Sequence, residues 1–348
     1  MEKDPVRING SYGEGGGQIL RTSLALSAIL KKPLVVHHIR AGRKPPGLRP
    51  QHLKGVEALA QITGGRTEGV KMGSETIEFI PGETVTGHHR FDVGSAGAVT
   101  LVLQALLLPL CLAREGSRLT LVGGTHVPWS PPYHYLSEVL LPSLKHMGVS
   151  MRTNIERWGW YPRGGGIVHV EVDPCFELKP ICLPERGRLK KVSGLSAISN
   201  LPDHVAQRQR DHALKRLEEE LRITAEIRVI SGVPANGPGS FLSLVLQSEG
   251  AIAGFSSLGE KGKPAEKVAN EVVDSLKDYL GSEGALDSHL ADQITPFMAL
   301  ARGRSSFTTT RITEHLLTNL WVVSHFLDVR IIRSGEKGQG GKIEFLNE

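Results

Sequence analysis

Cysteine and aromatic residues are scarce in this sequence. It holds three cysteines among 348 residues, too few for a disulfide framework, and no two of them have the Cys-x-x-Cys spacing of a zinc site. Aromatic residues make up 5 %, so a surface built mainly from stacked bases is not the first expectation. The low cysteine content favours a reducing compartment.

Long apolar runs are also missing. The longest, residues 98–113, is interrupted by Gln104 and Pro109 and is too short to cross a bilayer, so we expect no membrane partner. The first ten residues contain no apolar signal core, and we therefore expect a cytoplasmic rather than a secreted protein. With 40 % hydrophobic and 22 % charged residues, the chain has the balance of a globular protein of about two domains.

Glycine, by contrast, is abundant, and basic residues outnumber acidic ones. The 40 glycines fall in clusters, which is typical of backbone that turns tightly or approaches a ligand closely. The formal charge of +5 is a mild bias toward anionic partners.

A pattern of helices and strands recurs three times along the chain. In each unit an apolar helix is followed by a second helix and then by strands close to a glycine cluster. The apolar helices are expected at residues 18–30, 96–113 and 292–301, and the second helices open at Gln51, Tyr133 and Thr313. Apolar strands are expected after the first two apolar helices, at 33–39 and 118–122. Helices with one apolar stripe need a sheet to cover, so we predict a layered α/β fold of three related units.

Residues 185–280 interrupt this pattern. They predict a strand, a charged helix with Asp203 as its N-cap, three more strands and a helix that runs from Pro264 to Leu280. Polar, glycine-bearing segments flank them on both sides, as expected of linkers. We predict a small α/β domain at 185–280, inserted in a core made of residues 1–184 and 281–348.

The glycines at 13–17 lead into a predicted helix. Free backbone N–H groups at such a position can hold an anion. Glu14 could bind a divalent cation, and Arg21 could hold a phosphate from one turn inside the helix. A tight turn with a surface salt bridge explains the segment equally well. It is neither a Walker motif, because no Lys-Ser or Lys-Thr follows, nor a Rossmann fingerprint.

The loop at residues 39–52 is basic and stiffened by prolines. It contains Arg40, Arg43 and Gln51 and precedes a helix, which suits phosphate binding. A solvated loop is the alternative, at similar odds.

Three further segments have polar groups or rings suited to a flat base. Gln104 is a lone amide in an apolar helix, and such residues are more often satisfied in the core than used to contact a ligand. Residues 123–133 combine prolines and aromatics around Pro131 and form either a base sandwich or simply a rigid loop. Asp292, in the segment 289–293, could be only a helix N-cap.

His315 lies near a predicted helix start, among threonine hydroxyls. The positive end of a helix keeps an imidazole neutral and nucleophilic at neutral pH, and it also attracts a phosphate. A lone histidine is more often structural, so this segment alone does not decide the role of His315.

Taken together, these segments resemble the RNA 3′-terminal phosphate cyclase family. The matching segments are EGGGQILR (14–21), IRAGRKPPGL and QH (39–52), GSAG and TLVLQ (94–104), YPRGGG (161–166), HLADQ (289–293) and EHLLTN (314–319). The family signature Gly-x-x-Pro-x-Gly-Gly-Gly is found at 159–166, and the resemblance runs from about residue 8 to 345. It implies three repeats resembling the C-terminal domain of a translation initiation factor, plus an inserted small α/β domain.

The resemblance also implies a reaction. A histidine attacks ATP to give a covalent adenylate, the adenylyl group passes to an RNA 3′-phosphate, and the neighbouring 2′-OH closes a 2′,3′-cyclic phosphate and releases AMP. The implied partners are ATP, Mg²⁺ or Mn²⁺, and RNA that ends in a 3′-phosphate.

Each matching residue has an implied role. His315 would be the adenylated nucleophile, and Glu14 would bind the metal. The implied ATP-binding residues are Gln104, Pro131, His289, Leu290, Ala291, Asp292 and Gln293. The candidates for the phosphate or the RNA end are Arg21, Arg40, Arg43 and Gln51. Some family members have an aromatic where His289 stands, and an imidazole can also stack on adenine.

Two alternatives remain at this point. Cyclase-like relatives without the activity serve ribosome assembly, but they lack the nucleophilic histidine. Enolpyruvyl-transfer enzymes use related α/β repeats and would neither bind ATP nor release pyrophosphate. The sequence does not determine the physiological RNA, the preferred metal or the oligomeric state, and a homodimer is compatible with it.

Overall fold

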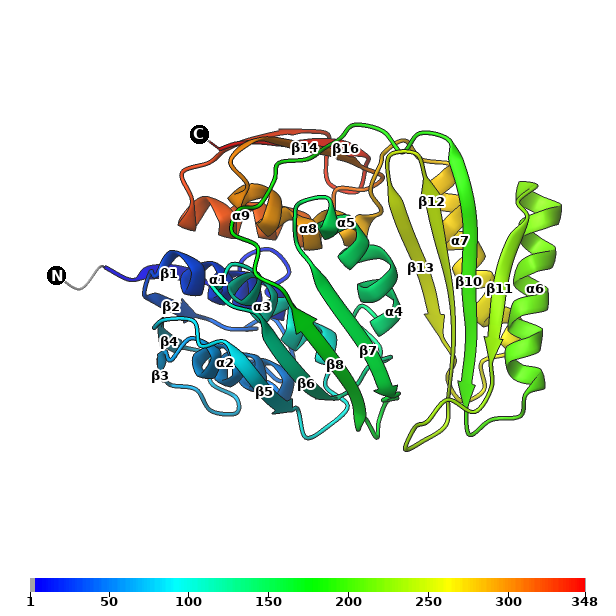
Figure 1. The fold of residues 1–348 in the computed structure, drawn as a ribbon, viewed down its shortest axis with the longest axis horizontal. Coiled ribbons are helices and arrows are strands. Elements are labelled where there is room, and N and C mark those ends of the chain that lie inside the picture. Colours follow the sequence, from blue (N-terminus) through cyan, green and yellow to red (C-terminus); the bar gives the residue numbers. More distant parts are fainter. Residues whose placement is uncertain (1–3, 348) are drawn as a thin grey trace.

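Helices and strands alternate along the chain and form four mixed sheets of four strands each (Figure 1). The structure, a computed structural model, describes residues 4–347. The predicted α/β class is confirmed. In residues 4–347, no helix is long and apolar enough to span a membrane.

The first sheet has the strand order β1-β2-β4-β3. Its segment contains β1 (Val6–Asn9), α1 (Gly17–Leu30), β2 (Leu34–His37), α2 (Pro50–Ile62), β3 (Arg66–Glu68) and β4 (Ile77–Ile80). β1 and β2 are parallel, and the other two pairings are antiparallel. In β4, buried Ile77 and Phe79 alternate with exposed residues, as in a sheet with one covered face.

The second sheet repeats this arrangement in the order β5-β6-β8-β7. Its segment contains β5 (Gly87–Asp92), α3 (Val99–Cys111), β6 (Ser117–Gly123), α4 (Tyr133–Tyr135), the π-helical turn η1 (Leu136–Leu140), α5 (Leu141–Lys145), β7 (Met151–Arg157) and β8 (Gly166–Val172). Again the first pair is parallel and the others are antiparallel.

The third sheet has the order β9-β14-β16-β15, with the same pattern of directions. Its elements are β9 (Cys182–Leu183), α8 (Ser288–Leu300), β14 (Gly303–Thr309), α9 (Glu314–Phe326), β15 (Arg330–Ser334) and β16 (Gly341–Asn347). No strand was predicted at β14, because its sequence is rich in hydroxyl side chains. Ser305, Phe307 and Thr309 are nevertheless fully buried there.

The fourth sheet lies between β9 and α8 in the sequence and has the order β11-β10-β12-β13. Its segment contains β10 (Leu189–Ser199), α6 (His204–Leu221), β11 (Ala225–Ile230), β12 (Gly239–Ser248), β13 (Ile252–Leu258) and α7 (Ala265–Leu280). α6 and α7 pack on each other and on this sheet, and they enclose a hydrophobic cluster of their own. Asp203 is the N-cap residue of α6, as predicted, but its side chain accepts no capping hydrogen bond.

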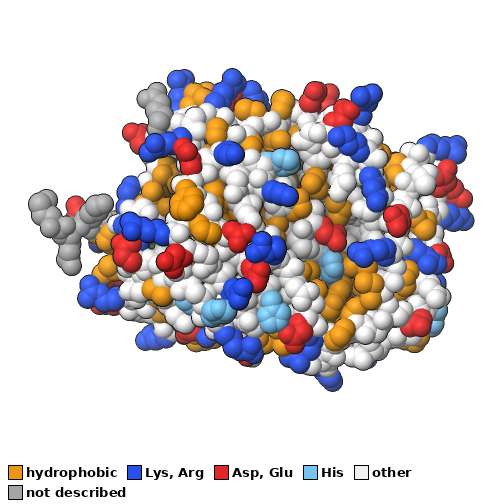
Figure 2. All heavy atoms as spheres, in the orientation of Figure 1, with side chains coloured by type: hydrophobic (Ala, Val, Ile, Leu, Met, Phe, Trp, Pro, Cys, Tyr) orange, Lys and Arg blue, Asp and Glu red, His pale blue; other side chains and the backbone are white. Residues whose placement is uncertain are grey.

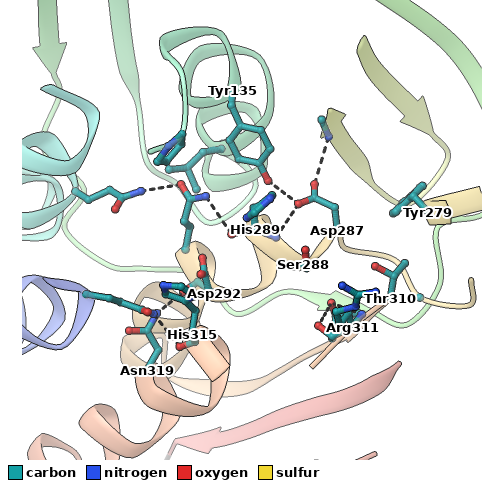
Figure 3. A pocket seen from close by; sticks show the side chains of 18 of the residues that line it. Tyr135, Tyr279, Asp287, Ser288, His289, Asp292, Thr310, Arg311, His315 and Asn319 are labelled. Atoms are coloured by element: carbon teal, nitrogen blue, oxygen red, sulfur yellow. Dashed lines mark hydrogen bonds between the residues drawn. The ribbon is translucent and has the colours of Figure 1, made fainter. Parts of the chain in front are cut away.

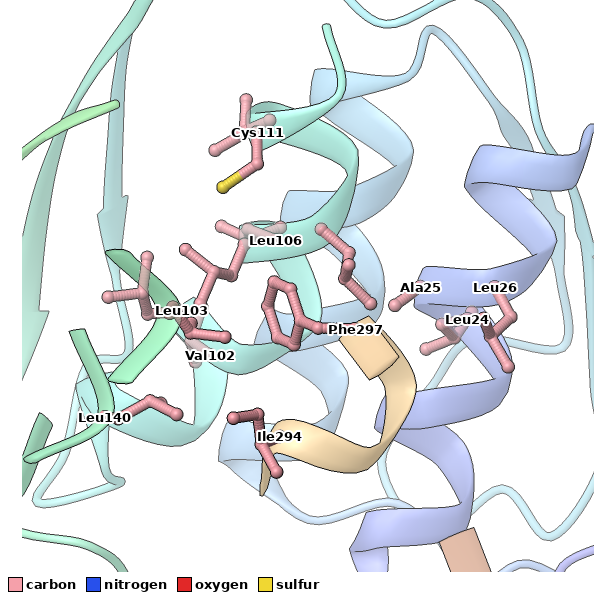
Figure 4. Close-up of a cluster of buried hydrophobic side chains, with 14 of the residues drawn as sticks. Leu24, Ala25, Leu26, Val102, Leu103, Leu106, Cys111, Leu140, Ile294 and Phe297 are labelled. Carbon is pink, nitrogen blue, oxygen red and sulfur yellow. The ribbon is translucent and has the colours of Figure 1, made fainter. Parts of the chain in front are cut away.

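Helices from different segments meet in the main core. α1 packs on α2, α3 and α9, and α8 packs on α9. Figure 4 shows Phe297 of α8 among aliphatic side chains of α1 and α3. This helix layer fixes the relative positions of the loops and helix ends that form the cleft described below.

A separate aromatic cluster joins the fourth sheet to the second. Trp158 and Trp160, which follow β7, pack with Phe241 of β12. The ring of His126 stacks on Trp158 with 4.0 Å between centroids, and burial lowers the pKa of His126. Trp160 Nε1 donates a hydrogen bond to Ser199 Oγ in β10.

On the face shown in Figure 2, basic and acidic side chains are interspersed and form no single basic patch. The excess of basic residues, which gives the net charge of +5, is therefore not concentrated into a broad anion-binding surface on this face.

Candidate active site

One cleft brings nearly all of the predicted site residues together. It has a volume of about 2470 Å³. Its lining includes Glu14, Arg21, Arg40, Arg43, Gln51, Gln104, Pro131, His289, Asp292, Gln293 and His315. These residues come from six separate stretches of the sequence, and the helix layer places them around one cleft.

Helix α8 presents one face to this cleft. It begins at Ser288, so His289, Asp292 and Gln293 lie three and four residues apart on the same side. Leu290 and Ala291 are fully buried in the hydrophobic core and do not line the cleft. The expectation that their side chains contact ATP is therefore corrected by helix geometry.

The N-cap of α8 also differs from the expectation. Asp292 lies inside the helix, and Asp287 is the cap, accepting hydrogen bonds from the backbone N–H groups of His289 and Leu290. The sequence offered a cap only as the alternative to an ATP-binding role for Asp292, with the helix expected at residues 292–301. In the structure, the helix extends one turn farther toward its N-terminus.

His315 occupies the second position of helix α9. Thr313 caps the helix by accepting a hydrogen bond from the N–H of Leu316 at 3.0 Å. His315 Nδ1 lies 3.6 Å from Glu14 Oε1, and the histidine side chain is 46 % exposed. Burial is the main cause that lowers the pKa of His315; Glu14 opposes this shift, and Arg21 adds to it. A lowered pKa favours the neutral form of the imidazole near neutral pH.

Two buried polar side chains hold α9 against its neighbours. Gln18 Nε2 in α1 donates to the His315 carbonyl at 2.8 Å. Asn319 Nδ2 donates to the Asp292 carbonyl at 2.7 Å, while Asn319 Oδ1 accepts from Thr22 Oγ1 at 2.7 Å. Figure 3 shows Asp292, His315 and Asn319 close together. Sequence reasoning missed the structural role of Asn319, whose only signal was its place one turn after His315.

Arg21 and Asp292 face each other in the cleft. Burial lowers the pKa of Arg21 to about 10, and the charge of Asp292 partly offsets this. Burial raises the pKa of Asp292 to about 8, against the opposing effect of Arg21. Such displaced pKa values mark groups that the fold keeps in a costly environment, which is common at functional sites.

The basic loop before α2 is held partly by its own arginine. Arg40 Nη1 donates to the carbonyls of Pro45 and Gly47 at 3.0 and 2.9 Å, so this side chain shapes the loop as well as lining the cleft. Arg43 Nη2 lies 3.5 Å from Glu14 Oε2. His52 is buried beside the start of α1, and burial and nearby arginines lower its pKa to about 3.

The amide of Gln104 is neither unpaired nor enclosed by the apolar core. Its Nε2 donates to Gln293 Oε1 at 2.8 Å, and Gln293 Nε2 donates to the His289 carbonyl at 3.0 Å. The Pro131 carbonyl accepts from Thr100 Oγ1 at 2.7 Å, which fixes the proline loop on α3. In the same loop the Trp129 side chain also lines the cleft and is 94 % exposed.

The family can now be assigned from comparison with known proteins. A family model described as RNA 3′-terminal phosphate cyclase matches residues 12–332. The chain belongs to the RNA 3′-terminal phosphate cyclase family. The resemblance inferred from the sequence is thereby confirmed.

Relatives named RNA 3′-terminal phosphate cyclase match almost the whole chain. The protein of Thermococcus onnurineus is 44 % identical over 342 residues, which is 98 % of this chain and 99 % of that protein. The protein of Archaeoglobus fulgidus is 44 % identical over 334 residues, 95 % of this chain and 98 % of its own. That of Gloeothece citriformis is 43 % identical over 329 residues, 92 % and 93 % respectively.

A solved structure gives a much weaker likeness. The enolpyruvyl transferase NikO from Streptomyces tendae is 11 % identical, with a TM-score of 0.39 over 99 % of this chain and 49 % of that one. This chain thus spans about half of the solved chain, and so weak a likeness supports no conclusion about activity.

In this cyclase family member, the segment between β9 and α8 also forms part of the cleft. Arg186, Phe255 and Tyr279 line it, together with Arg311 at the end of the third sheet. The Arg186 guanidinium lies 4.3 Å from the centre of the Tyr279 ring, and Nη1 donates to the Tyr279 carbonyl at 2.6 Å. The cleft therefore extends from His315 to the fourth sheet.

Among the described residues of this cyclase family member, no three histidine, cysteine or acidic side chains are grouped so as to hold a metal ion. Glu14 is a single carboxylate beside His315 and Arg43. Magnesium is usually bound by one or two carboxylates together with substrate phosphates, so one carboxylate is compatible with a metal that arrives with a nucleotide.

Proposed function

We propose that this protein is an ATP-dependent RNA 3′-terminal phosphate cyclase that acts through adenylation of His315. One observation carries the proposal. A partly exposed imidazole with a lowered pKa lies at the N-terminus of α9, beside the Glu14 carboxylate and in a cleft lined by five arginines. This set of groups suits a nucleophile that attacks an anionic phosphate.

In the first step, a neutral nitrogen of His315 attacks the α-phosphorus of ATP. The N–P bond forms, the bond to pyrophosphate breaks, and pyrophosphate leaves. Because Nδ1 faces Glu14, Nε2 is the nitrogen that remains open to the cleft. An RNA 3′-phosphate oxygen then attacks the same phosphorus and releases the histidine.

The last step is intramolecular. The 2′-OH of the terminal ribose loses its proton and attacks the 3′-phosphorus, and AMP leaves with the bond that joined it to the RNA. Adenylation makes this step feasible because a phosphate monoester has no good leaving group. The requirement for a 2′-OH restricts cyclisation to ribose ends.

The lining of the cleft fits both substrates. Its volume of about 2470 Å³ exceeds the roughly 300–1,000 Å³ of an ordinary small-molecule pocket, which leaves room for a nucleotide and an RNA end. We assign the adenosine to the face of α8 with Gln104 and Pro131, and the ATP phosphates to Arg43. We assign the RNA 3′-phosphate to Arg21 and a base near the RNA end to Trp129. Aromatic faces stack on any base and suit this last role.

Mg²⁺ or Mn²⁺ would be held by Glu14 together with the phosphates of ATP. Such an ion would neutralise charge on the departing pyrophosphate. The chain's own part is to hold the Glu14 carboxylate beside His315, which the glycines around it permit. Gly13 has φ +57°, and a Cβ there would lie 2.6 Å from Thr318 Oγ1.

We also propose that the chain consists of three related units, residues 1–184 and 281–348, with an inserted domain at 185–280. The shared strand order and directions of the first three sheets support this division. The separate hydrophobic cluster of the fourth sheet supports the insertion. Residues 1–3 and 348 lie outside the described residues.

The test is self-labelling with ATP radioactive at the α-phosphate, with Mg²⁺ or Mn²⁺. The wild type should become labelled, and His315→Ala should not. His325→Ala is the matched control, because this histidine lies on the same helix at its exposed end. The gel must stay neutral or alkaline, since a phosphoramidate is lost in acid.

The label should then be chased onto RNA. An RNA 3′-phosphate should end as a 2′,3′-cyclic phosphate, whereas an end with a 3′-phosphate but no 2′-OH should stop at the adenylated stage. Full labelling of His315→Ala would refute the assignment of the nucleophile. A folded wild type that takes no label with either metal would favour the noncatalytic ribosome-assembly alternative.

A further inference from the structure

The carboxylate of Asp287 accepts more hydrogen bonds than a helix cap requires. The residue is 4 % exposed, and within residues 4–347 no lysine, arginine or histidine nitrogen lies within ion-pair distance of it. A buried charge without a partner is costly unless several hydrogen bonds satisfy it. Four donors surround this one, and Figure 3 shows it between Tyr135 and the start of α8.

The four donors come from three parts of the chain. Oδ1 accepts from the N–H groups of His289 and Leu290 at 2.9 and 3.0 Å, which is the helix cap, and from the Tyr135 hydroxyl at 2.8 Å. Oδ2 accepts from the N–H of Gly254 in β13 at 3.3 Å. A serine would satisfy the cap alone. The additional reach of the carboxylate joins α8 to α4 and to the fourth sheet.

Gly254 is what allows β13 to come so close. A Cβ at this position would lie 2.6 Å from Val139 Cγ2 and 3.0 Å from the ring of Tyr135. The contact thus depends on two independent features: Gly254 has no side chain, and Asp287 has a second carboxylate oxygen to accept its N–H. That contact links residues 185–280 to the first turn of α8.

Asp287 lines the cleft itself and caps the helix turn that carries the next residues of the lining. His289, Asp292 and Gln293 line the cleft, and the first of these directly follows the capped turn. A shift of β13 relative to the core is passed through the carboxylate to this face of α8. The Tyr135 hydroxyl makes the link stiffer, because it fixes the carboxylate from a third direction.

We propose that Asp287 is a positioning residue, through which the inserted segment 185–280 holds the cleft-facing side of α8 in place for the nucleotide. This inference rests on the proposed ATP-dependent activity and assigns a role to the inserted segment. Asp287 also lines the cleft, but its carboxylate is occupied by four hydrogen bonds within the protein, so its effect is exerted through His289, Asp292 and Gln293.

Asp287→Asn is the sharpest variant. The amide oxygen can keep the cap and the bond from Tyr135, while the amide nitrogen replaces Oδ2 and faces the Gly254 N–H. Two donors then oppose each other, and the link to β13 alone is broken. The flipped amide would lose the three hydrogen bonds at Oδ1 and regain only the one from Gly254, so the unflipped form is favoured. The variant therefore selectively breaks the link to β13.

The control is Ser199→Ala. It removes the acceptor of the Trp160 N–H and so loosens another buried contact between the inserted segment and the core, far along the chain from α8. In self-adenylation, we expect Asp287→Asn to raise the KM for ATP about tenfold, equivalent to about 1.4 kcal/mol, with kcat changed less than about twofold. Ser199→Ala should leave this KM within about twofold.

Hydrogen exchange supplies a measurement that does not depend on activity. In Asp287→Asn, amides of β13 and of residues 288–293 should both exchange faster, whereas Ser199→Ala should leave residues 288–293 unchanged. An unchanged KM, or an equal rise in both variants, would overturn the proposal. If the wild type takes no label from ATP, the proposed function fails instead. Exchange at residues 288–293 then decides the coupling by itself, and no change there refutes it.

Discussion

Replacing Asp292 by asparagine should stabilise the protein while weakening nucleotide binding. Burial raises the pKa of this carboxyl from its ordinary 3.8 to about 8. The unfolded chain loses this proton near pH 4, and the folded chain keeps it to about pH 8. The stability associated with Asp292 is therefore fully present below about pH 4 and is lost as the pH rises to about 8.

The size of the stability penalty follows from the pKa values of Asp292 in the unfolded and the folded chain. Each pH unit between 3.8 and 7 costs about 1.4 kcal/mol, so the penalty at pH 7 is at most about 4 kcal/mol. Because Asp292 lines an open cleft and is only partly buried by surface area, we expect about half of this, ~2 kcal/mol. Asparagine stands in for the protonated acid and carries no such penalty.

Urea unfolding followed by circular dichroism measures the effect. The gain in the free energy of unfolding of Asp292→Asn over the wild type should be small at pH 4.5, grow with pH and level off above about pH 8. Asp203→Asn, which changes an exposed carboxylate in front of α6, is the control and should show no such gain. A variant less stable than the wild type at pH 8, or a gain independent of pH, would refute the reasoning.

Three further outcomes are expected from the proposed function. Because burial lowers the pKa of His315, the acid limb of the self-adenylation rate should have its midpoint below pH 6.5; a midpoint above this value would contradict the environment assigned to His315. Arg21→Ala should impair transfer to RNA more than self-adenylation, and equal effects on both steps would argue against an RNA contact. Arg40→Ala should also lower the free energy of unfolding by ~1 kcal/mol, because the variant loses the hydrogen bonds to two loop carbonyls. Trp129→Ala should raise the KM for RNA roughly tenfold. The KM for ATP and the stability should stay nearly unchanged, because the exposed ring makes no core contact. The control is Phe176→Ala, which removes an exposed aromatic ring that does not line the cleft.

The fold class, and most helices, could be predicted because their signals are local. The helix that opens at Gln51 and the one that opens at Thr313 have apolar periodicity and clear stops, and the structure places α2 and α9 within one or two residues of the expected bounds. β14 was missed because hydroxyl side chains cover its buried face. Their burial is decided by β9 and β16 on either side, which no local pattern reveals.

The site shows the same division. Glycine clusters and a basic loop made Glu14 and the arginines candidates, and the family resemblance singled out His315; the structure places them in one cleft. The start of α8 could not be located in this way. The sequence predicts a helix from Asp292 onward and does not point to Asp287, which caps the helix by accepting from the N–H groups of His289 and Leu290. The further contacts of Asp287 with Tyr135 and Gly254 are not visible in a local pattern. The exclusion of Leu290 and Ala291 from the cleft followed only once the start of the helix was known.

Asp287, which is buried, and Asp292, which is partly buried, affect the stability of α8 in opposite directions. Asp287 is satisfied by four donors and stabilises the start of α8. Asp292, five residues later, has its pKa displaced to about 8 opposite Arg21, so it weakens the fold at the point where the proposed nucleotide binds. In our proposal, the hydrogen bond from Gly254 to Asp287 offsets part of this cost at the start of the helix. It thereby ties the stability of α8 to residues 185–280, which also contribute Arg186, Phe255 and Tyr279 to the cleft.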